Sequence, residues 1–185
     1  MKKFGADKFD LRTAEEKSRG ILAFAWVTEF PLFKKTKEGS LTYGHNPFTG
    51  PRPQDEAKLL HGRELEHILS LQYDLVCNGE EVGGGGIRIT KAHVLEKVFE
   101  IIGHTREEVE REFGHMLKAF RHGAPPEGGI ALGVDRMVAI LAGEESIREV
   151  QAFPMTSGGR TSAMDAPSGV SEEQLKELGI APRRE

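Results

Sequence analysis

The sequence predicts an α+β fold in which helices flank an antiparallel sheet. Its strand-like segments come first and are followed by two amphipathic helices and then by one strand–helix unit. This order differs from the βαβ alternation that is typical of parallel sheets. Asn78-Gly79 joins two strand-like segments, and this dipeptide is a strong signal for a hairpin of antiparallel strands. The 185 residues suffice for a domain with its own core, so a single domain is expected over residues 1–185.

The N-terminal part of the chain is predicted to hold a short helix and a buried strand. Thr13 and Glu16 have the spacing of a capping box, which starts a helix by satisfying two free backbone N–H groups. Residues 21–30, ILAFAWVTEF, form a continuous apolar run, so we expect a strand covered on both faces, with Trp26 in the core. A returning strand and two short helices are expected next, at residues 41–45, 51–60 and 63–71.

The segments that follow predict a hairpin and two longer helices. The hairpin strands are expected at residues 72–78 and 80–89. Thr90 is expected to cap a helix over residues 91–102, which carries an apolar stripe on one face, and Gly103 is expected to end it. A second capping box begins at Thr105 and predicts a helix that extends to Phe120.

The most informative segment spans residues 128–143. Small and apolar residues lead to a turn at Gly133 and then into a helix, with Arg136 at the junction. An arginine delivered to a glycine-lined surface suits an anionic ligand such as a nucleotide phosphate. The alternative is a strand–helix unit in which Arg136 pairs with a carboxylate such as Asp135, and periodicity supports both interpretations equally. A last short helix is expected after Ser171.

Four consecutive glycines, residues 83–86, interrupt a strand pattern between Glu81 and Arg88. Glycine weakens a strand, so we expect a flat ligand on this backbone; a bulge or a loop is the alternative. The glycine spacing fits neither a P-loop nor a dinucleotide-binding turn. Glu81 and Arg88 are seven positions apart, an odd separation that points them to opposite faces of a regular strand. A bulge in the glycine run would restore a common face.

Two carboxylates, Asp74 and Glu81, lie across the predicted hairpin. If they converge they would suit Mg²⁺, which prefers one or two carboxylates together with phosphate oxygens and water. The better-supported alternative is that both are surface charges paired with lysine or arginine. His45 stands at the end of a strand and would be able to contact a carboxylate substrate, although a lone histidine in such a place is more often structural.

Bulk composition excludes several classes of protein. A net charge of −4 argues against a free-standing electrostatic nucleic-acid binder. Cys77 is the only cysteine, which excludes an intrachain disulfide and a cysteine-based zinc cluster and fits a cytoplasmic location. The seven histidines lack zinc-ligand spacing. No apolar run approaches the ~20 residues of a membrane span, so no membrane partner is expected.

Stretches spread over nearly the whole chain resemble, in order, the C-terminal half of the catalytic domain of bacterial-type aspartyl-tRNA synthetases, a class II family. MKKFGADKFDLR resembles the segment after motif 2, FAWVTEFPLF a later strand, and GHNPFTGP a histidine-containing loop. YDLVCNGEEVGGGGIRI resembles the hairpin that binds aspartate and ATP. GAPPEGGIALGVDRMVAILAGEESIREVQAFP resembles motif 3 with its continuation, and APSGVSEEQLKELGI the usual C-terminus. The hairpin and motif 3 stretches are specific because of their length.

The resemblance implies a partial class II catalytic domain with ATP and Mg²⁺ as cofactors. Its reaction would be the ATP-dependent activation of L-aspartate, followed by transfer of aspartate to tRNA. Arg136 and Glu81 would be the catalytic groups; Arg136 would hold ATP phosphate, and Glu81 would contact ATP through Mg²⁺, which Asp74 helps to hold. By position, the ATP-binding residues would be Glu81, Gly133, Val134, Asp135 and Arg136.

The resemblance also implies the other substrates and partners. Arg88 would grip the side-chain carboxylate of aspartate, and His45 would close over that substrate. The tRNA would be tRNA(Asp), with tRNA(Asn) as a second substrate in enzymes of relaxed specificity. We expect a homodimer or association with a complementing N-terminal half, because strands missing from the sheet would leave an open edge.

The sequence departs from the family pattern in several respects. Residues 1–20 correspond to the segment after motif 2 and run directly into the strand at residue 21. Motifs 1 and 2, the anticodon-binding domain and the usual inserted domain therefore have no counterpart in the sequence. Single positions that depart from the usual residues are Asn46, Gly86 and Met155. A C-terminal fragment or one half of a split ligase is therefore expected, with weak activity in isolation.

Two alternatives stay open. The first is a non-catalytic synthetase-like paralogue that binds nucleotide, the tRNA end or a partner protein, as the missing motifs suggest. The presence of both the ATP-binding and the aspartate-binding residues argues against it. The second is a sister class II enzyme for asparagine or lysine, against which Arg88 argues because its charge suits an anionic side chain.

Overall fold

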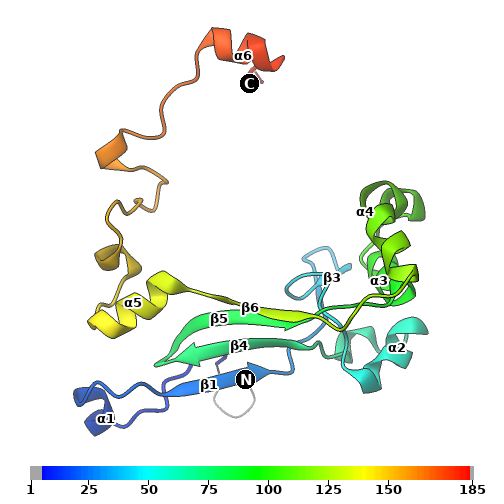
Figure 1. Cartoon of the computed structure of the whole chain (residues 1–185), viewed down its shortest axis with the longest axis horizontal. Helices are drawn as coiled ribbons and strands as arrows, with labels where there is room; N and C mark the ends of the chain where they lie inside the picture. The colour runs from blue at the N-terminus through cyan, green and yellow to red at the C-terminus, as the bar shows by residue number, and fades with distance from the viewer. Residues whose placement is uncertain (1–5, 184–185) are drawn as a thin grey trace. The chain divides into compact units, whose positions relative to one another are not determined.

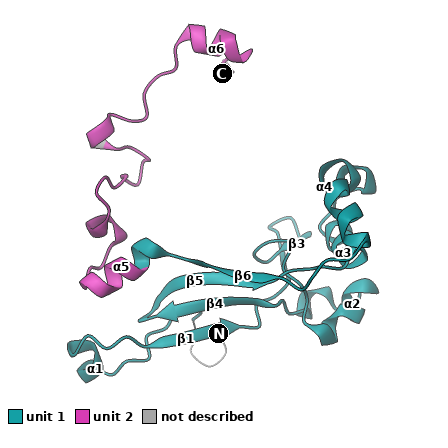
Figure 2. Cartoon of the chain, viewed as in Figure 1, with its two compact units in different colours: residues 1–136 teal, residues 137–185 magenta. Residues whose placement is uncertain are grey.

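The computed structural model describes residues 6–183, so the first five residues of the segment after motif 2 and the last two of the chain lie outside the described part. The chain forms two compact units, residues 1–136 and residues 137–185 (Figure 2). The single functional domain expected over residues 1–185 stays a prediction, because compactness alone does not separate two functional domains.

Unit 1 is built on a four-stranded sheet with the strand order β1-β4-β5-β6 (Figure 1). Its strands are β1 Phe24–Thr28, β4 Gln72–Cys77, β5 Glu80–Ile87 and β6 Gly128–Leu132. A separate two-stranded sheet pairs β2 Phe33–Lys35 with β3 Leu41–Tyr43. All of these strand pairs are antiparallel, which confirms the predicted sheet type.

Helices gather at one end of the four-stranded sheet, where β4 begins and β5 ends (Figure 1). They are α2 Glu56–Leu60, α3 Ala92–Ile101 and α4 Arg106–Arg121, together with the 3-10 turns η1 Pro53–Asp55 and η2 Leu65–His67. The short helix α1 Ala14–Ser18 lies at the opposite end, near the turn between β4 and β5 (Figure 1). The structure therefore confirms an α+β fold with helices beside an antiparallel sheet.

Local capping explains where the helices begin and end. Thr13 and Thr105 each form the predicted capping box at the start of α1 and α4. The predicted cap at Thr90 is wrong, because the N-cap of α3 is Lys91 and makes no side-chain cap bond. Gly103 has a φ of 96° and follows the last turn of α3 as predicted, since glycine adopts this left-handed conformation without steric cost.

The buried core of unit 1 lies among the helices and the β2–β3 hairpin. Phe99 of α3 is 1% exposed and stacks on Phe113 of α4 with ring centroids 4.6 Å apart. The buried members of this cluster are Leu32, Phe33, Leu59, Ile68, Ile89, Val94, Leu95, Val98, Phe99, Val109 and Leu117. All of them lie outside the four sheet strands. The sheet buries Val27, Val76, Cys77 and Val82 in addition, so apolar burial stabilises both the helical end and the sheet.

The prediction that residues 21–30 are covered on both faces, with Trp26 in the core, is wrong. Phe24 and Trp26 of β1 are 54% and 60% exposed. They share a sheet face with Ile130 and Leu132 of β6, which are exposed as well. Strand parity places these apolar side chains on one face, and the described residues of unit 1 leave these four side chains uncovered.

The prediction of a helix over residues 63–71 is also wrong. Glu64 has a φ of 50°, a left-handed conformation that a helix does not continue through, and only the short turn η2 follows it. Leu69 and Ser70 then each form an isolated β-bridge. The backbone N–H of Ser70 donates to the carbonyl oxygen of Phe30 at 2.7 Å, so this stretch pairs as an extended chain.

Unit 2 consists of short elements joined by irregular segments. After the end of α5 Val134–Ala142, these elements are η3 Ile147–Val150, η4 Ser162–Met164 and α6 Glu172–Leu178. Helix α6 starts at the predicted capping box of Ser171 and ends at Gly179, whose φ is 64°. In the described part of the chain, no helix is long and apolar enough to cross a membrane.

The contrast between Phe99 and Trp26 gives a stability prediction. Phe99→Ala removes a buried ring and should lower the free energy of unfolding by about 3–5 kcal/mol. Trp26→Ala removes an exposed ring that has an edge-to-face contact with Tyr73, so we expect a loss of about 1 kcal/mol or less. Urea unfolding should be followed by far-ultraviolet circular dichroism. Tryptophan fluorescence would not serve for both variants, because Trp26 is the only tryptophan. Equal losses would mean that the exposed face is packed in solution.

Candidate functional site

A β-bulge at Val82 decides which side chains share a face of the sheet. Leu75 pairs with Gly83 and Val76 pairs with Glu81, so Val82 is an extra residue in β5. An extra residue reverses the alternation of side chains beyond it. Glu81 therefore points to the same face as Arg88, although their odd separation would place them on opposite faces of a regular strand. The bulge immediately precedes the glycine run, whereas the sequence predicted it inside the run.

The carboxylates of Asp74 and Glu81 converge above Gly84. A Cβ atom at Gly84 would lie 3.1 Å from Oδ1 of Asp74 and 3.3 Å from Oε1 of Glu81. Both side chains therefore occupy the space that a larger residue at position 84 would fill. This donor set fits Mg²⁺, which takes one or two carboxylates and completes its shell with phosphate oxygens and water. Within the described residues, no third histidine, cysteine or acidic side chain joins them as a metal cluster.

Burial raises the pKa of the Asp74 carboxyl above its ordinary value. The negative charge of Glu81 raises this pKa further, whereas the hydrogen bond from Gln72 and the charge of His45 lower it. The Nε2 atom of Gln72 donates to Oδ1 of Asp74 at 3.5 Å, and Gln72 is buried. The carboxylate pair is thus an unfavourable concentration of negative charge, which a cation would relieve.

Arg136 contacts the bulge directly. Its Nη1 atom donates to the carbonyl oxygen of Glu81 at 2.8 Å and lies 3.8 Å from Oε2 of the same residue. The backbone N–H of Gly133 donates to the carbonyl oxygen of Val82 at 2.9 Å. The Arg136 side chain remains 42% exposed, so it holds the bulge and still presents donors to a ligand. The carboxylate with which Arg136 forms this ion pair is that of Glu81 in β5.

Arg88 lies at the other end of the glycine run. Its Nη1 atom donates to Oδ1 of Asn46 at 3.3 Å. The same oxygen accepts from the backbone N–H groups of Phe48 and Thr49, at 3.0 Å each, so an Asx-type turn orients the arginine's partner. His45, next to Asn46, is exposed, and it is close enough for its charge to act on Asp74.

The structure therefore brings most of the predicted site residues to one face of the sheet. Asp74 and Glu81 lie above Gly84, Arg136 adjoins Glu81, and Arg88 follows Gly86. The N–H of Gly133 binds the bulge, and Val134 and Asp135 are exposed at the start of α5. Their individual roles toward ligands stay predictions.

Three further residues of this face were missed by the sequence interpretation: Gln72, Asn46 and Thr49. Gln72 has the same strand parity as Asp74, which would have placed it beside the carboxylate pair. The Asn-Pro dipeptide at Asn46 is a turn signal and predicted a turn there, but it did not indicate that the Asn46 side chain would accept a hydrogen bond from Arg88. Thr49 is buried, and a Cβ atom at Gly86 would lie 2.9 Å from its Cγ2; no sequence signal indicated this contact.

The raised pKa of Asp74 predicts a pH-dependent stability. A carboxyl with a raised folded-state pKa destabilises the fold above that pKa, and the effect disappears as the pH falls through it. Asp74→Asn should therefore raise Tm at neutral pH, with the gain vanishing in acid. A calorimetric pH series measures this effect.

Asp10 is the matched control, because it shows the opposite shift. A hydrogen bond from the Arg12 side chain holds the pKa of Asp10 well below its usual range, so the ionised carboxylate stabilises the fold above its unfolded-state pKa and this contribution is lost as the pH falls. Asp10→Asn should therefore lower Tm at neutral pH. If Asp74→Asn also lowers Tm there, Asp74 is not under the unfavourable charge described above.

Comparisons with known proteins identify the family of the chain. The family model described as tRNA synthetases class II (D, K and N) matches residues 1–157. A protein of Rubrobacter xylanophilus named aspartate–tRNA(Asp/Asn) ligase is 52% identical over 164 residues, which are 88% of this chain and 27% of that protein. One of the same name from Phenylobacterium zucineum is 49% identical over 172 residues, which are 92% of this chain and 28% of that protein. The chain thus spans little more than a quarter of the length of these relatives.

Solved structures show the same fold. An aspartyl-tRNA synthetase from Entamoeba histolytica superposes with a TM-score of 0.52 at 23% identity, over 71% of this chain and 22% of that one. An asparaginyl-tRNA synthetase from Pyrococcus horikoshii gives a TM-score of 0.53 at 21% identity, over 72% and 26% of the two chains. Because the family model covers most of the sequence, the chain belongs to the class II tRNA synthetases of the aspartate, lysine and asparagine group.

Proposed function

We propose that this chain supplies the C-terminal part of the catalytic domain of an aspartate–tRNA ligase. The observation that carries the proposal is the bulge at Val82, which places Arg88 and the Asp74–Glu81 pair on one sheet face. That face offers an arginine for a carboxylate substrate and, at its other end, acidic groups and Arg136 for a metal-bound nucleotide. The names of the relatives, which share about half of their residues with this chain over the matched part, support the same reaction.

ATP would be held by the groups around the bulge. Arg136 has a fork of donors, of which Nη1 is engaged by the carbonyl oxygen of Glu81, and its remaining donors suit phosphate oxygens. Gly133 sets the turn that brings α5 to the bulge. Mg²⁺, when bound by Asp74 and Glu81, would neutralise phosphate charge. In adenylate formation the protein mainly positions the reactants and stabilises developing charge, and these residues would do both.

L-aspartate would lie over the glycine run with its side-chain carboxylate at Arg88. A guanidinium binds a carboxylate through two parallel hydrogen bonds, and the uncharged amide of asparagine would lose that charge-assisted pair. Asn46 fixes the orientation of Arg88, and His45 in the adjoining turn would close over the substrate. The positive charge of Arg88 also disfavours a lysine substrate.

The remaining partners follow from the relatives. Those proteins are named for tRNA(Asp/Asn), so we propose both tRNAs as acceptors in the assembled enzyme, and a cytoplasmic location. The outer edges of β1 and β6 end the four-stranded sheet of unit 1, and unpaired edges favour association. We therefore propose association with a second copy or with a complementary N-terminal part of the domain; a strictly monomeric species in light scattering at high concentration would argue against it.

A chimaera tests the proposed function. This chain would replace the matching segment of the Rubrobacter xylanophilus relative, and aspartate-dependent ATP–pyrophosphate exchange would be measured. We expect activity in the chimaera and little in the isolated chain, because each missing charge-stabilising donor costs about 10²–10³ in rate. A folded but inactive chimaera would favour the alternative of a non-catalytic paralogue.

The same chimaera tests the role of Arg88. Arg88→Gln should lower kcat/KM for aspartate by about 100-fold, since the substrate carboxylate would lose its charged partner, while KM for ATP should change little. Arg63→Gln is the matched control, because Arg63 is exposed and lies away from the glycine run. Unchanged aspartate kinetics in Arg88→Gln would remove Arg88 from the proposed substrate site.

Gly84 allows a direct test of the carboxylate pair. In Gly84→Ala the new methyl group would push the Asp74 and Glu81 side chains apart, because both carboxylates lie within 3.3 Å of its position. We expect about 10-fold weaker Mn²⁺ binding by electron paramagnetic resonance. Gly129→Ala in β6 is the control, since a Cβ atom there meets nothing within 4 Å. Equal affinities in the two variants would place the cation elsewhere.

A further inference from the structure

The stretch of β5 that carries Glu81 is short and isolated from the rest of the strand. Between the hairpin turn and the bulge, only Cys77–Glu80 and Val76–Glu81 are paired with β4. The bulge at Val82 interrupts the ladder there, and a local disruption of pairing weakens the coupling to the remaining strand. The orientation of the Glu81 carboxylate therefore depends on what holds this stretch from outside.

On the side of β1, the hairpin turn is tied to the chain at Ala23. The backbone N–H of Asn78 donates to the carbonyl oxygen of Ala23 at 3.1 Å, and the N–H of Ala23 donates to Oδ1 of Asn78 at 2.9 Å. Asn78 has a φ of 54°, a conformation that asparagine tolerates better than most residues. These reciprocal bonds fix the turn to the segment that leads into β1.

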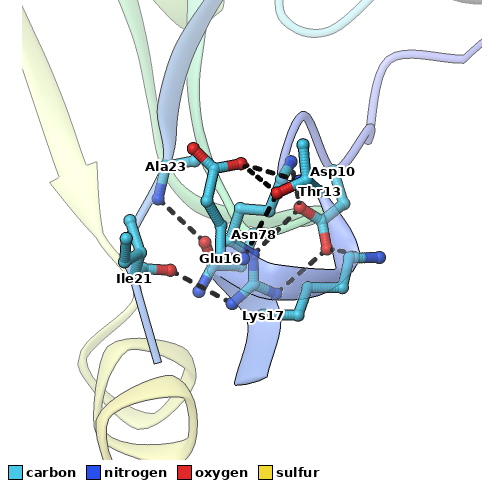
Figure 3. A network of polar contacts seen from close by, with 8 residues as sticks. Asp10, Thr13, Glu16, Lys17, Ile21, Ala23 and Asn78 are labelled. Atoms are coloured by element: carbon cyan, nitrogen blue, oxygen red, sulfur yellow. Dashed lines mark hydrogen bonds and ion pairs between the residues drawn. The ribbon is translucent and has the colours of Figure 1, made fainter. Parts of the chain in front are cut away.

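A polar cluster around Asp10 then covers the turn, as Figure 3 shows. Two nitrogen atoms of Arg12, Nε and Nη2, donate to the two carboxylate oxygens of Asp10 at 3.0 Å each. Nη1 of Arg12 donates to the carbonyl oxygen of Ile21 at 3.1 Å, and Nζ of Lys17 lies 3.1 Å from Oδ2 of Asp10. The cluster thus joins the ends of the loop that contains α1.

Asp10 also lies beside the hairpin turn. A Cβ atom at Gly79 would lie 3.5 Å from Cβ of Asp10, so the acidic residue rests against the tip of the hairpin. The side chains of Arg12 and Asp10 are only 15% and 20% exposed, and a bidentate pair with little access to water is stronger than an exposed one.

Helix α1 and the core cluster of unit 1 add no apolar contact to this arrangement. Helix α1, which lies between the two ends of the loop, has no buried residue, and the core cluster of unit 1 contains no residue of the segment before β1. The polar cluster around Asp10 thus supplies directional contacts of this segment beside the hairpin turn.

We propose that Arg12, acting through Asp10 and the Asn78–Gly79 turn, is a positioning residue for Glu81. Arg12 holds the turn of the hairpin, while Arg136 and Gly133 hold the bulge. The short stretch of β5 between the turn and the bulge is therefore fixed at both ends. Its relevance to catalysis rests on the proposed function, in which Glu81 and Asp74 bind the cation of Mg²⁺–ATP. The positioning itself does not depend on that function.

Amide hydrogen exchange in the isolated chain tests the positioning. In Arg12→Ala, the amides of Glu81 and Val82 should exchange about 10-fold faster, because a charge-assisted bond that closes the segment is lost. Amides beyond the bulge, such as that of Gly85, should keep their rates. Arg12→Lys retains a charge for Asp10 but loses the bidentate geometry, so an intermediate rate is expected at Glu81.

Arg19→Ala is the matched control. Arg19 follows the same helix and its side chain is exposed, 4.0 Å from Glu15, so exchange at Glu81 should stay at the wild-type rate. The inference is overturned if Arg12→Ala leaves the rates at Glu81 and Val82 unchanged, if it raises rates equally throughout the sheet, or if Arg19→Ala has the same local effect.

Mn²⁺ titration of the same samples separates this inference from the proposed function. We expect Mn²⁺ binding to weaken by about 10-fold in Arg12→Ala, as for other residues that orient a metal ligand, and to be unchanged in Arg19→Ala. Unchanged affinity in Arg12→Ala would overturn the link to cation binding. A wild-type chain that fails to bind Mn²⁺ would overturn the proposed cation site, and the exchange rates would still decide whether Arg12 positions Glu81.

Discussion

The candidate site depends on one extra residue in one strand. Without the bulge at Val82, strict alternation would point Glu81 and Arg88 to opposite faces of the sheet. With the bulge, the Asp74–Glu81 pair and Arg88 share a face of the sheet, and the glycine run lies between them. Bulges next to functional sites redirect side chains in this way. The bulge interrupts the pairing of β5 with β4 at the point where the direction of the Glu81 side chain is set. Contacts from other segments must replace the lost pairing.

Those replacement contacts are polar. Some come from residues that follow β5 in the chain and others from the segment that precedes β1. Gly133 and Arg136 bind the carbonyl oxygens of Val82 and Glu81 from the C-terminal side, and the segment before β1 binds the turn from the N-terminal side. The largest apolar cluster lies elsewhere, among the helices, although Val76 and Val82 are buried beside the bulge. At the site, non-directional apolar burial therefore acts together with hydrogen bonds, whose geometric preferences set the direction of the side chains.

The sequence was sufficient to predict features with a local cause. The capping boxes at Thr13 and Thr105 and the turn at Asn78 are decided by residues within a few positions of each other, and the structure confirms them. The odd spacing of Glu81 and Arg88 also indicated that a bulge would be needed for the two side chains to share a face. Features with a non-local cause escaped prediction. Trp26 is exposed because no described layer of unit 1 covers it, and the approach of Thr49 to Gly86 joins residues that are far apart in the sequence.

The two interpretations of Arg136 that the sequence left open turn out to be compatible. The strong contact of its guanidinium is to a neutral carbonyl oxygen at 2.8 Å, whereas the carboxylate of Glu81 lies 3.8 Å away. A neutral acceptor orients the guanidinium without cancelling its charge, and a loose ion pair can be exchanged for a phosphate at small cost. An arginine anchored in this way is already oriented for an anion, so less conformational entropy is lost when the anion binds. The structural contact and the proposed role in binding ATP then follow from the same geometry.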